Sequence, residues 1–594
     1  IAKMRNLSSS SWGNDDDYKT AQDVIESERN SGNIKLYLAI DNEEVVGYCS
    51  FSEYRQDEGA SYLPLINVRP DYHSKKIGKA LILKVLEDAK YSKWPRIDLY
   101  TWSGNTKAMP IYKKCGFFWE RRNNTVHLMN FLPYVYQTEA LIPYLNQIDV
   151  YQDNIRDIHL GYDGEEEQGF DIYYYQFKND HTYLNLGFEK TARGLVYLDH
   201  PDYQIRLSLD QHKVVFNQRY EASLLIDSKN DSTLDVVIQG RNHQHIHCDF
   251  NERLIVSGKQ IIKIPFDILP TDLVQDLGKT HPCVEINLWL NGQQATLKCG
   301  VLTKPPIDVS LTTLEMNHIK NEIYHAYLDL ENHLDDQTTF NIHCPTANVD
   351  FLEDVTITLD QGERRSIKIP YRFKQAGFYQ QQAFIKYGNQ DYNKTLTAMF
   401  KDLSSSFVCD LDKEVKIVSG NTVMTYQKVN HDITFSNRYD QVSDIDFMPP
   451  KLGLPYSLEF NNIEPTLTID SNNQITLTYL SQAFKDVQLN VIIHHHYGLL
   501  EVVYEVINFG IERDLSLSIP IVKSLMHSMI PYQSRLLQVD LYGGYIGNIS
   551  GHQIDEHWIY NEEFKQGFIW PKDIKVKVTN WHFSFDVEAI HLKQ

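Results

Sequence analysis

The chain has 594 residues, of which 42% are hydrophobic and 12% aromatic, a composition that argues for a globular protein and against a disordered one. Its net charge of −21 is uneven: residues 1–135 hold 19 Lys and Arg against 17 Asp and Glu, or +2, so the other 459 residues carry −23. Because so acidic a surface repels nucleic acid and anionic membranes, we expect neither as a partner.

The compartment is indicated by the cysteines and the apolar runs. Seven scattered cysteines without a Cys-x-x-Cys pair fit buried thiols in a reducing compartment better than a disulfide framework. The sequence shows no signal peptide and no apolar run of membrane length. These features predict a cytoplasmic protein, and the start at Ile1 rather than Met leaves open whether the N-terminus is truncated.

Apolar periodicity and turn residues divide residues 1–135 into strands and helices. The expected elements are, in chain order, a strand at Ile1–Leu7, a helix capped by Asn14 that ends near Asn30, strands at Lys35–Ile40, Val45–Tyr54 and Tyr62–Val68, a helix from Gly78 to about Tyr91, a strand at Arg96–Trp102, a helix after Asn105, and strands at Phe117–Arg122 and Val126–Phe131. This order predicts an α/β (α+β) domain.

The turn before the helix at Gly78 has the features of a phosphate site. An apolar run stops at Pro70, and Gly78 then lies at the start of the amphipathic run Ile77–Leu86. The first turn of a helix leaves backbone N–H groups unpaired and carries partial positive charge. Since Gly78 has no Cβ, a pyrophosphate can approach the main chain there. Alone this signal is weak, because many glycines merely begin helices.

A second informative stretch runs from Asn105 to Phe117. Asn105 fits a helix N-cap, and Gly116 fits the residue that ends the helix. The residues between them that follow helical spacing are Ala108, Ile111, Tyr112 and Cys115. This stretch begins about 25 residues after the phosphate turn, so two motifs occur in sequence.

Together the two motifs resemble those of the GNAT N-acetyltransferase family. In that family Arg/Gln-x-x-Gly-x-Gly/Ala holds the pyrophosphate of acetyl-CoA, and the matching stretch here is Lys75–Ala80. The family's Asn-x-x-Ala-x-x-x-Tyr-x-x-x-Gly-Phe unit matches at Asn105, Ala108, Tyr112, Gly116 and Phe117. The resemblance covers about residues 1–135 and implies direct acetyl transfer to an amine, without a covalent enzyme intermediate.

The resemblance also implies site residues. A backbone N–H near Ile66 or Asn67 would stabilise the carbonyl oxygen as it gains charge, and Tyr112 would protonate the departing thiolate. The implied cofactor-binding residues are Ile66, Asn67, Val68, His73, Ser74, Lys75, Lys76, Ile77, Gly78, Lys79, Ala80, Asn105 and Tyr112. Acetyl-CoA is the expected cosubstrate, and no metal is expected.

Each catalytic assignment has a plainer alternative. Tyr112 could be a packed aromatic of an amphipathic helix, and Asn105 could be only a helix cap. Glu53 on a central strand is the candidate general base, but an exposed strand-face carboxylate is the preferred interpretation. Lys75 and Lys76 could be plain surface charges, yet two cations beside a phosphate turn favour binding.

The chain departs from the family pattern at three places. Lys75 stands where Arg or Gln is usual, which keeps the charge but loses the planar fork. Pro110 lies inside the helix after Asn105, where a proline is tolerable near the first turn. The span from Leu7 to Lys35 has room for about one helix, where the family places two that wall the acceptor site. We therefore expect an open acceptor pocket or one that another domain completes.

The remaining residues predict a series of β domains. Residues 136–202 are interpreted as a connecting β-rich segment. A repeat follows, in which Tyr220-Glu-Ala-Ser-Leu-Leu-Ile-Asp recurs from Tyr324, at an offset of 104. Copies of this size with short strands predict immunoglobulin-like β-sandwiches at 203–305 and 306–402. Residues 403–594 have longer strands and resemble a galactose-mutarotase-like supersandwich by texture rather than by motif.

Three histidines in the first copy are candidate zinc ligands. On a strand, His243, His245 and His247 would share one face because side chains alternate. A zinc site would use such imidazoles and keep an open position. A polar outer face of a sandwich strand is the preferred interpretation.

The sequence thus predicts an acetyl-CoA-dependent N-acetyltransferase whose β-rich region positions the acceptor amine. That acceptor could be a small molecule, an amino sugar or a peptide. The alternative is a carbohydrate-binding or carbohydrate-processing β protein with an accessory acyl-CoA-binding domain. A third hypothesis is a scaffold whose N-terminal domain merely binds acyl-CoA. The acceptor, the general base and the oligomeric state are left open.

Overall fold

A computed structural model describes the helices and strands of most of the chain, and beyond residue 509 it describes strands alone. The described residues are 1–8, 18–29, 33–53, 57, 59–92, 94–122, 126–167, 169–271, 275, 278–315, 317–402, 404–420, 422–429, 431–437, 445–447, 451–453, 464–472, 474–480, 487–496, 499–509, 514–518, 521–523, 528–532, 535–539, 544–550, 556–561, 566–571, 574–577 and 580–590.

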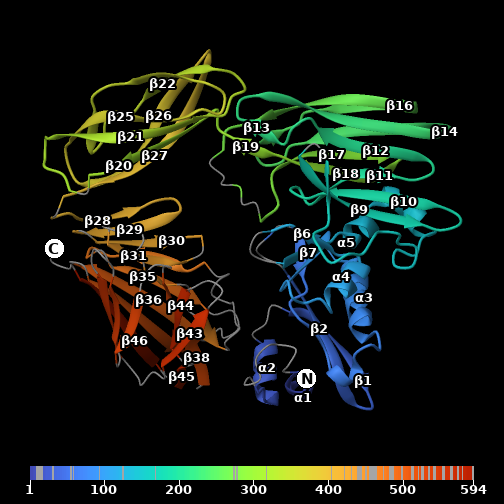
Figure 1. The fold of residues 1–594 in the computed structure, drawn as a ribbon, viewed down its shortest axis with the longest axis horizontal. Helices are drawn as coiled ribbons and strands as arrows, with labels where there is room; N and C mark the ends of the chain where they lie inside the picture. The colour runs from blue at the N-terminus through green and yellow to red at the C-terminus, as the bar shows by residue number, and fades with distance from the viewer. Residues whose placement is uncertain are drawn as a thin grey trace. The chain divides into compact units, whose positions relative to one another are not determined.

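These residues form two compact units, each taken here by itself (Figure 1). The first consists of Ile1–Val24 and Gly32–Ile307, and the second of Ile25–Ser31 and Asp308–Gln594. Strands dominate both units and helices are few, which confirms the predicted β-rich character. In the described part of the chain, no helix combines the length and the apolar character needed to cross a membrane.

The N-terminal part of the first unit is a seven-stranded sheet in the order β1-β2-β3-β5-β7-β6, with β4 paired to β2 beside β3. Neighbouring strands are antiparallel except β3 and β5, which are parallel. The elements of residues 1–145, of which α2 lies partly in the second unit, are α1 (Ala2–Asn6), α2 (Ala21–Arg29), β1 (Asn33–Asp41), β2 (Glu44–Glu53), β3 (Ala60–Tyr62), β4 (Ile66–Val68), α3 (Ile77–Ala89), β5 (Arg96–Thr101), α4 (Met109–Lys114), β6 (Phe118–Glu120), β7 (Val126–Asn130), α5 (Leu132–Gln137) and α6 (Ile142–Leu145).

The core of this domain lies between the sheet and α3. Cys49 and Phe51 of β2 belong to one buried apolar cluster with Leu81 and Val85 of α3. Gly47 lets the helix approach, because a Cβ there would lie 3.1 Å from Ile77 Cγ2. Burial of each large apolar side chain contributes roughly 1.5–3 kcal/mol, so this interface fixes α3 on the sheet.

Two predicted elements differ in the structure. The strand predicted at Tyr62–Val68 is interrupted between β3 and β4, and Ile1–Leu7 contains helix α1 rather than a strand. Met4 is the buried side chain of α1, whereas Leu7 is 53% exposed. A strand on the sheet would bury alternate side chains, and this segment has no such face. The predicted cap Asn14 lies outside the described residues, and α2 begins at Ala21.

The rest of the first unit is a ten-stranded sheet in the order β15-β16-β14-β12-β11-β10-β9-β8, to which β14 also adds β17 and then β18. The sheet crosses residue 202 without a break, because β11 pairs with β12 and β12 pairs with β14. Its ten strands are β8 (Glu165–Glu167), β9 (Phe170–Lys178), β10 (Tyr183–Glu189), β11 (Gly194–Asp199), β12 (Tyr203–Leu209), β14 (Arg219–Arg241), β15 (Ile246–His247), β16 (Asn251–Ile268), β17 (Cys283–Leu290) and β18 (Gln293–Gly300). A separate two-stranded parallel sheet consists of β13 (Lys213–Val215) and β19 (Leu302–Lys304).

The second unit begins with two four-stranded sheets, β20-β21-β25-β23 and β24-β22-β26-β27. Their strands are β20 (Ile307–Thr313), β21 (Ile323–Asn332), β22 (Thr338–His343), β23 (Val349–Phe351), β24 (Val355–Leu359), β25 (Arg364–Phe373), β26 (Gly377–Tyr387) and β27 (Gln390–Phe400).

The sequence repeat produces the same local structure twice. The hydroxyl of Tyr220 at the start of β14 accepts a hydrogen bond from the Val215 N–H, and that of Tyr324 on β21 accepts one from Ile319 N–H, both at 2.8 Å. Their cross-strand partners are also aromatic, namely Phe266 and Tyr371. Each copy therefore anchors its long hairpin through a tyrosine that bonds back to the preceding backbone.

The C-terminal part of the second unit contains two eight-stranded sheets, β28-β29-β30-β31-β32-β39-β44-β43 and β34-β35-β36-β37-β46-β42-β41-β40, and a three-stranded sheet, β33-β38-β45. The strands are β28 (Ser406–Asp410), β29 (Glu414–Ser419), β30 (Thr422–Gln427), β31 (Ile433–Asn437), β32 (Ile445–Phe447), β33 (Lys451–Gly453), β34 (Thr466–Ile469), β35 (Ile475–Leu480), β36 (Val487–His496), β37 (Leu499–Asn508), β38 (Asp514–Ser518), β39 (Ile521–Lys523), β40 (Ser528–Tyr532), β41 (Arg535–Val539), β42 (Gly544–Ser550), β43 (Glu556–Asn561), β44 (Gln566–Pro571), β45 (Ile574–Lys577) and β46 (Asn580–Ile590).

Candidate functional site

The predicted phosphate turn connects β4 to α3 and has an unusual backbone. A 3₁₀ turn at Pro70–Tyr72 begins it, and Ser74 and Lys76 then adopt left-handed conformations with φ of 65° and 62°. Left-handed residues of this kind bring successive N–H groups together into a concavity that binds anions. The backbone alone therefore has the shape of an anion site.

Six consecutive backbone N–H groups, from Ser74 to Lys79, have no acceptor among the described residues. We call Ser74–Lys79 the amide row. On either side of it the amides are paired: His73 N–H donates to Pro70 O at 3.1 Å, and Ala80 N–H donates to Lys76 O at 3.0 Å. Because the amide row also contains the first turn of α3, the helix dipole adds partial positive charge to it.

Three lysines of the amide row have ammonium groups that could bind an anion. In the described part of the chain, Lys75, Lys76 and Lys79 make no ion pair, and Lys75 Nζ lies 3.9 Å from the ring centroid of Tyr72. Arg69 differs, because its guanidinium is 2.7 Å from carboxylates of both Glu44 and Asp71. The lysines therefore leave a local excess of positive charge beside the unpaired amides.

Gly78 lies in the amide row without a structural need for glycine. A Cβ there would lie 3.7 Å from Val68 Cγ2, an ordinary contact, and Gly78 is not among the residues with positive φ. The protein itself would therefore accept alanine. A bare backbone at this point is explained by close approach of a ligand.

The edge of β4 that faces away from β2 is open. Arg69 N–H bonds Val46 O and Ser50 N–H bonds Leu65 O, so alternation turns the N–H and C=O of Asn67 toward β2. The N–H groups of Ile66 and Val68 then point to the open edge. Of the two sequence candidates for the oxyanion donor, Ile66 therefore has the suitable direction.

His73 lies at that same edge. Its Nε2 is 2.9 Å from Val68 O, and because a carbonyl only accepts, Nε2 carries the proton of this hydrogen bond. The imidazole therefore joins the phosphate turn to the strand edge.

The helix that carries Tyr112 is held at both ends. Asn105 Oδ1 accepts the Ala108 N–H at 3.3 Å, which confirms the predicted cap, although the helix proper begins at Met109. At the other end, Gly116 N–H bonds Lys113 O at 3.0 Å and Phe117 N–H bonds Tyr112 O at 3.2 Å. These two bonds form a Schellman motif with Gly116 at its left-handed position.

The Tyr112 side chain is 6% exposed and belongs to the apolar core. Burial raises its pKa above the ordinary value, and Cys49 and Tyr62 add to the shift. The hydroxyl therefore keeps its proton at neutral pH and can act only as a donor or an acid. Both the predicted acid and the plainer packed aromatic fit this burial.

Gly116 gives a stability prediction. We expect Gly116→Ala to destabilise the fold by about 3 kcal/mol, because φ is 97° and a Cβ would lie 2.8 Å from Leu132 Cδ1. Gly78→Ala is the matched control, since its Cβ has room, and its urea midpoint should stay at the parent value. Equal midpoints for the two variants would contradict this account of the turn.

Glu53, the candidate base, ends β2 opposite Ser61. Its side chain lies outside the described residues, so its catalytic role stays a prediction.

Sequence reasoning missed two small polar residues, Ser50 and Ser52, on the sheet face opposite α3, where the predicted cofactor-binding residue Asn67 also lies. Ser50, Ser52 and Asn67 are all buried, and Asn67 Nδ2 has no partner in the described structure. The serines bond the backbone only weakly, at 3.4 and 3.5 Å. The sequence does contain a signal for the two serines. Ser50 and Ser52 alternate with Cys49 and Phe51, which face α3, so the serines must point to the opposite face.

A buried charge network crosses the other end of the same face. Arg96 on β5 is 2.5 Å from Asp57 and 2.7 Å from Asp98. His127 on β7 lies between Asp98, at 3.1 Å, and Glu120, at 2.6 Å. Several of these residue types could act as acids or bases, so their environments decide their role.

The network continues into the ten-stranded sheet. Glu120 is 2.6 Å from Arg122 and 3.0 Å from Arg193, which precedes β11. Arg122 also donates to Gly278 O at 2.6 Å, and Thr280 N–H donates to Asp57 at 2.8 Å. Three guanidinium groups thus balance three carboxylates at the junction of the two sheets.

The carboxylates of the network are poor bases. Burial would raise the pKa of Glu120, but the hydrogen bond with His127 and the charge of Arg193 outweigh it and lower the pKa to about 2. Burial would also raise the pKa of Asp98, but the charges of Arg96 and His127 hold it well below its usual range. Carboxylates that release protons so readily take them up poorly, so the network is structural.

The Glu120 pKa predicts acid sensitivity. A carboxylate whose pKa falls on folding stabilises the protein above its unfolded pKa of about 4.3 and loses that contribution as the pH drops toward about 2. We expect Glu120→Gln to cost about 3 kcal/mol at pH 7, because it leaves buried guanidinium groups unpaired. The gap between parent and variant urea midpoints should narrow from pH 4.5 to pH 2.5. A gap independent of pH would refute the assignment.

The three histidines weighed for zinc do not share a strand face. His243 and His245 lie in a tight turn, where Gln244 has a φ of 53°. His243 instead comes within 4.8 Å of Cys283 and Glu285 by ligand atoms. These groups already have partners: His243 Nδ1 accepts the Cys283 N–H, and Glu285 is ion-paired at 2.9 Å.

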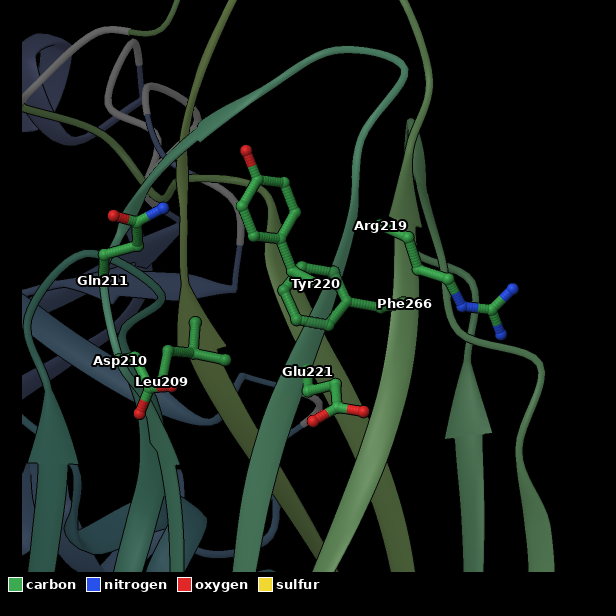
Figure 2. Close-up of a pocket in the computed structure, with 7 residues that line it drawn as sticks. All are labelled: Leu209, Asp210, Gln211, Arg219, Tyr220, Glu221 and Phe266. Carbon is green, nitrogen blue, oxygen red and sulfur yellow. The ribbon is translucent and has the colours of Figure 1, made fainter. Parts of the chain in front are cut away.

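A hollow of about 400 Å³ lies where β12, β14 and β16 meet, apart from the amide row (Figure 2). Its aromatic residues are Tyr220 and Phe266, whose ring centroids are 5.8 Å apart and which pack on each other (Figure 2). The Tyr220 hydroxyl is already bonded to Val215 N–H. This arrangement does not favour the stacking of a sugar.

Comparison with known proteins gives one family match. Residues 1–117 match the model of the acetyltransferase (GNAT) family. No curated protein matches the chain.

Solved structures also resemble a small part of the chain. The PaiA N-acetyltransferase of Thermoplasma acidophilum, in complex with coenzyme A, is 21% identical over 18% of this chain and 66% of its own, with a TM-score of 0.16. The ribosomal-protein-S18-alanine N-acetyltransferase of Escherichia coli is 16% identical over 18% and 75%, with a TM-score of 0.16. A Bacillus subtilis acetyltransferase in complex with CoA is 21% identical over 19% and 84%, with a TM-score of 0.16.

The PaiA structure is matched over only 66% of its own length, and the Escherichia coli structure over 75%. Identities and TM-scores this low carry no information about activity. The family-model match therefore supports a GNAT acetyltransferase domain at the N-terminus, over residues 1–117 of the 594.

Proposed function

We propose that the N-terminal domain, residues 1–135, transfers an acetyl group from acetyl-CoA to an amine. The observation that carries this proposal is the amide row Ser74–Lys79, six unpaired N–H groups beside three unpaired lysines in the described structure. The family-model match over residues 1–117 supports it. When bound, acetyl-CoA supplies an acetyl group activated as a thioester.

The residues of the domain take separate roles in this reaction. The amide row and Lys75 bind the pyrophosphate, and Asn105 and the β4 edge orient the rest of the cosubstrate. Ile66 N–H donates to the carbonyl oxygen as it gains charge. Tyr112 gives its proton to the sulfur as the carbon–sulfur bond breaks and the nitrogen–carbon bond forms. The amine loses one proton to the candidate base Glu53, which passes it to water, and Tyr112 recovers one proton from water, so the protons balance.

The acceptor amine is placed on the sheet face opposite α3. The support is chemical: Ser50, Ser52 and Asn67 are polar side chains there with weak or missing partners in the described structure. Such groups suit an acceptor with hydroxyl or carbonyl groups near its amine, such as an amino sugar or a peptide. Glu53 stays the candidate base.

The β-rich remainder is proposed to support the acceptor site. The tyrosines Tyr220 and Tyr324 bond back to the preceding backbone in the same way, which favours two immunoglobulin-like sandwiches at 203–305 and 306–402. We assign residues 136–202 to a connection whose strands β8–β11 extend the sheet of the first sandwich, and 403–594 to a supersandwich. A cytoplasmic location is proposed on composition alone.

Titration of the full chain with acetyl-CoA in a calorimeter tests the first step, and free-thiol release against a panel of amines tests the second. We expect saturable binding and amine-dependent release. Absence of acetyl-CoA binding would contradict the proposal. Binding without thiol release would favour the scaffold that only holds acyl-CoA.

A further inference from the structure

The C-terminal end of α4 is held by residues that lie beyond the family match. Residues 153–163, which we call the strap, precede β8 in the chain. They cross this end of the helix and form hydrogen bonds to β9 and to β6. At the start of the strap, Ile155 N–H donates to Gln176 O on β9 at 2.9 Å. At its end, Asp163 N–H donates to Trp119 O on β6 at 2.9 Å. The strap is therefore fixed to both the seven-stranded and the ten-stranded sheet of the first unit.

Arg156 of the strap contacts the last turn of α4 directly. Its Nη2 donates to Lys113 O and to Phe117 O, both at 2.8 Å. Its Cζ lies 4.1 Å from the ring centroid of Phe118. Nε and Nη1 are buried with no partner in the described structure, which costs stability. The hydrogen bonds of this guanidinium in the described structure therefore all go to these two carbonyl groups.

Asp163 holds the same turn through a side chain. Lys113 is fully buried, and its Nζ is 2.9 Å from Asp163 Oδ2 and 2.6 Å from Gly161 O. The same carboxylate oxygen accepts Trp119 N–H at 2.7 Å. One carboxylate therefore ties the helix to the backbone of β6.

A third contact comes from β9. The Tyr175 hydroxyl donates to Gly116 O at 2.7 Å and accepts Phe131 N–H at 3.0 Å. The residues that end the Tyr112 helix are thus bonded by three side chains from the following 60 or so residues.

We propose that Arg156 and Asp163 are positioning residues, through which the strap sets the place of the Tyr112 hydroxyl during acetyl transfer. This inference rests on the proposed function, in which Tyr112 protonates the thiolate. A six-residue helix is too short to hold its own geometry, so its anchors decide where its side chains lie. A displacement of about 1 Å at a reacting group can cost about 100-fold in rate.

A double-mutant cycle tests the proposal. Arg156→Met should lower kcat by about 10-fold or more when Tyr112 is present, and by less than about 2-fold in the Tyr112→Phe background. The Kd for acetyl-CoA should stay at the parent value, because the strap does not touch the amide row. Arg156→Lys, which keeps the charge, should restore part of the rate. Turnover is read as thiol release with the best amine of the panel, or as acetyl-CoA hydrolysis.

Two controls make the result decisive. Arg206→Met removes an arginine of β12 that pairs with Glu167 instead of α4, and kcat should not change. If Arg156→Met does not fold, Asp163→Asn replaces it, since its amide oxygen can still accept Trp119 N–H. Equal losses of kcat in both Tyr112 backgrounds, or a weaker Kd for acetyl-CoA, would overturn the positioning role. A parent enzyme that releases no thiol would instead refute the proposed function.

Discussion

Gly78→Glu is expected to abolish acetyl-CoA binding, weakening Kd by about 100-fold or more, which is about 2.7 kcal/mol. The new carboxylate would stand within the amide row, beside backbone N–H donors without acceptors and three lysines without ion pairs among the described residues. It would satisfy those donors itself and repel a pyrophosphate. Two unit charges about 4 Å apart at a protein surface repel by roughly 4 kcal/mol, so the charge suffices.

Gly78→Gln and Gly78→Ala separate charge from bulk. Gln has the size of Glu without its charge, so the difference between the two variants isolates the electrostatic part. Ala tests only the closeness of approach, and its Cβ has room against Val68. All three variants should keep the parent melting temperature, and titration calorimetry gives each Kd. Binding by Gly78→Glu at the parent affinity would remove the amide row from the coenzyme site.

The features predictable from sequence are those encoded within about 15 consecutive residues. The helix at Ile77–Ala89, the cap at Asn105 and the turn at Gly116 each depend on neighbours in the chain. Helical spacing, a capping side chain and a glycine at positive φ leave their marks locally. For this reason the sequence alone predicts the phosphate turn and the Tyr112 helix.

The features that sequence could not give depend on distant contacts. Helix α1 was mistaken for a strand, because seven residues with a few apolar side chains suit either form. The break between β3 and β4 frees the edge at Ile66, and it is visible only through pairing with β2. Arg156 and Asp163 lie about 40 residues beyond the helix that they hold. No local pattern marks such partners, and the sequence predicts residues 136–202, which include the strap, only as a connecting β-rich segment.

Tyr112→Phe should leave acetyl-CoA binding intact and lower kcat by about 10²–10⁴-fold, the usual contribution of a positioned acid. The ring stays in the apolar core with Phe117, whose centroid is 6.1 Å away, so packing is preserved and only the hydroxyl is lost. Tyr37→Phe is the matched control. It removes a hydroxyl that bonds Asp88 near the end of α3 at 2.8 Å, so it should cost about 1 kcal/mol of stability and leave kcat unchanged.

The pH dependence separates an acid from a packed aromatic. Because burial raises the pKa of Tyr112, its proton is present throughout the neutral range, and kcat should not fall between pH 7 and pH 9. In Tyr112→Phe the thiolate must take its proton from water, so an amine-dependent rate would remain but at the lowered level. Unchanged kcat in Tyr112→Phe would make Tyr112 a core residue only, and would leave the proton to another acid such as Tyr62, whose hydroxyl bonds the backbone of Tyr100. Its pKa is raised to about 12, chiefly by burial, so it too would serve as an acid and not as a base.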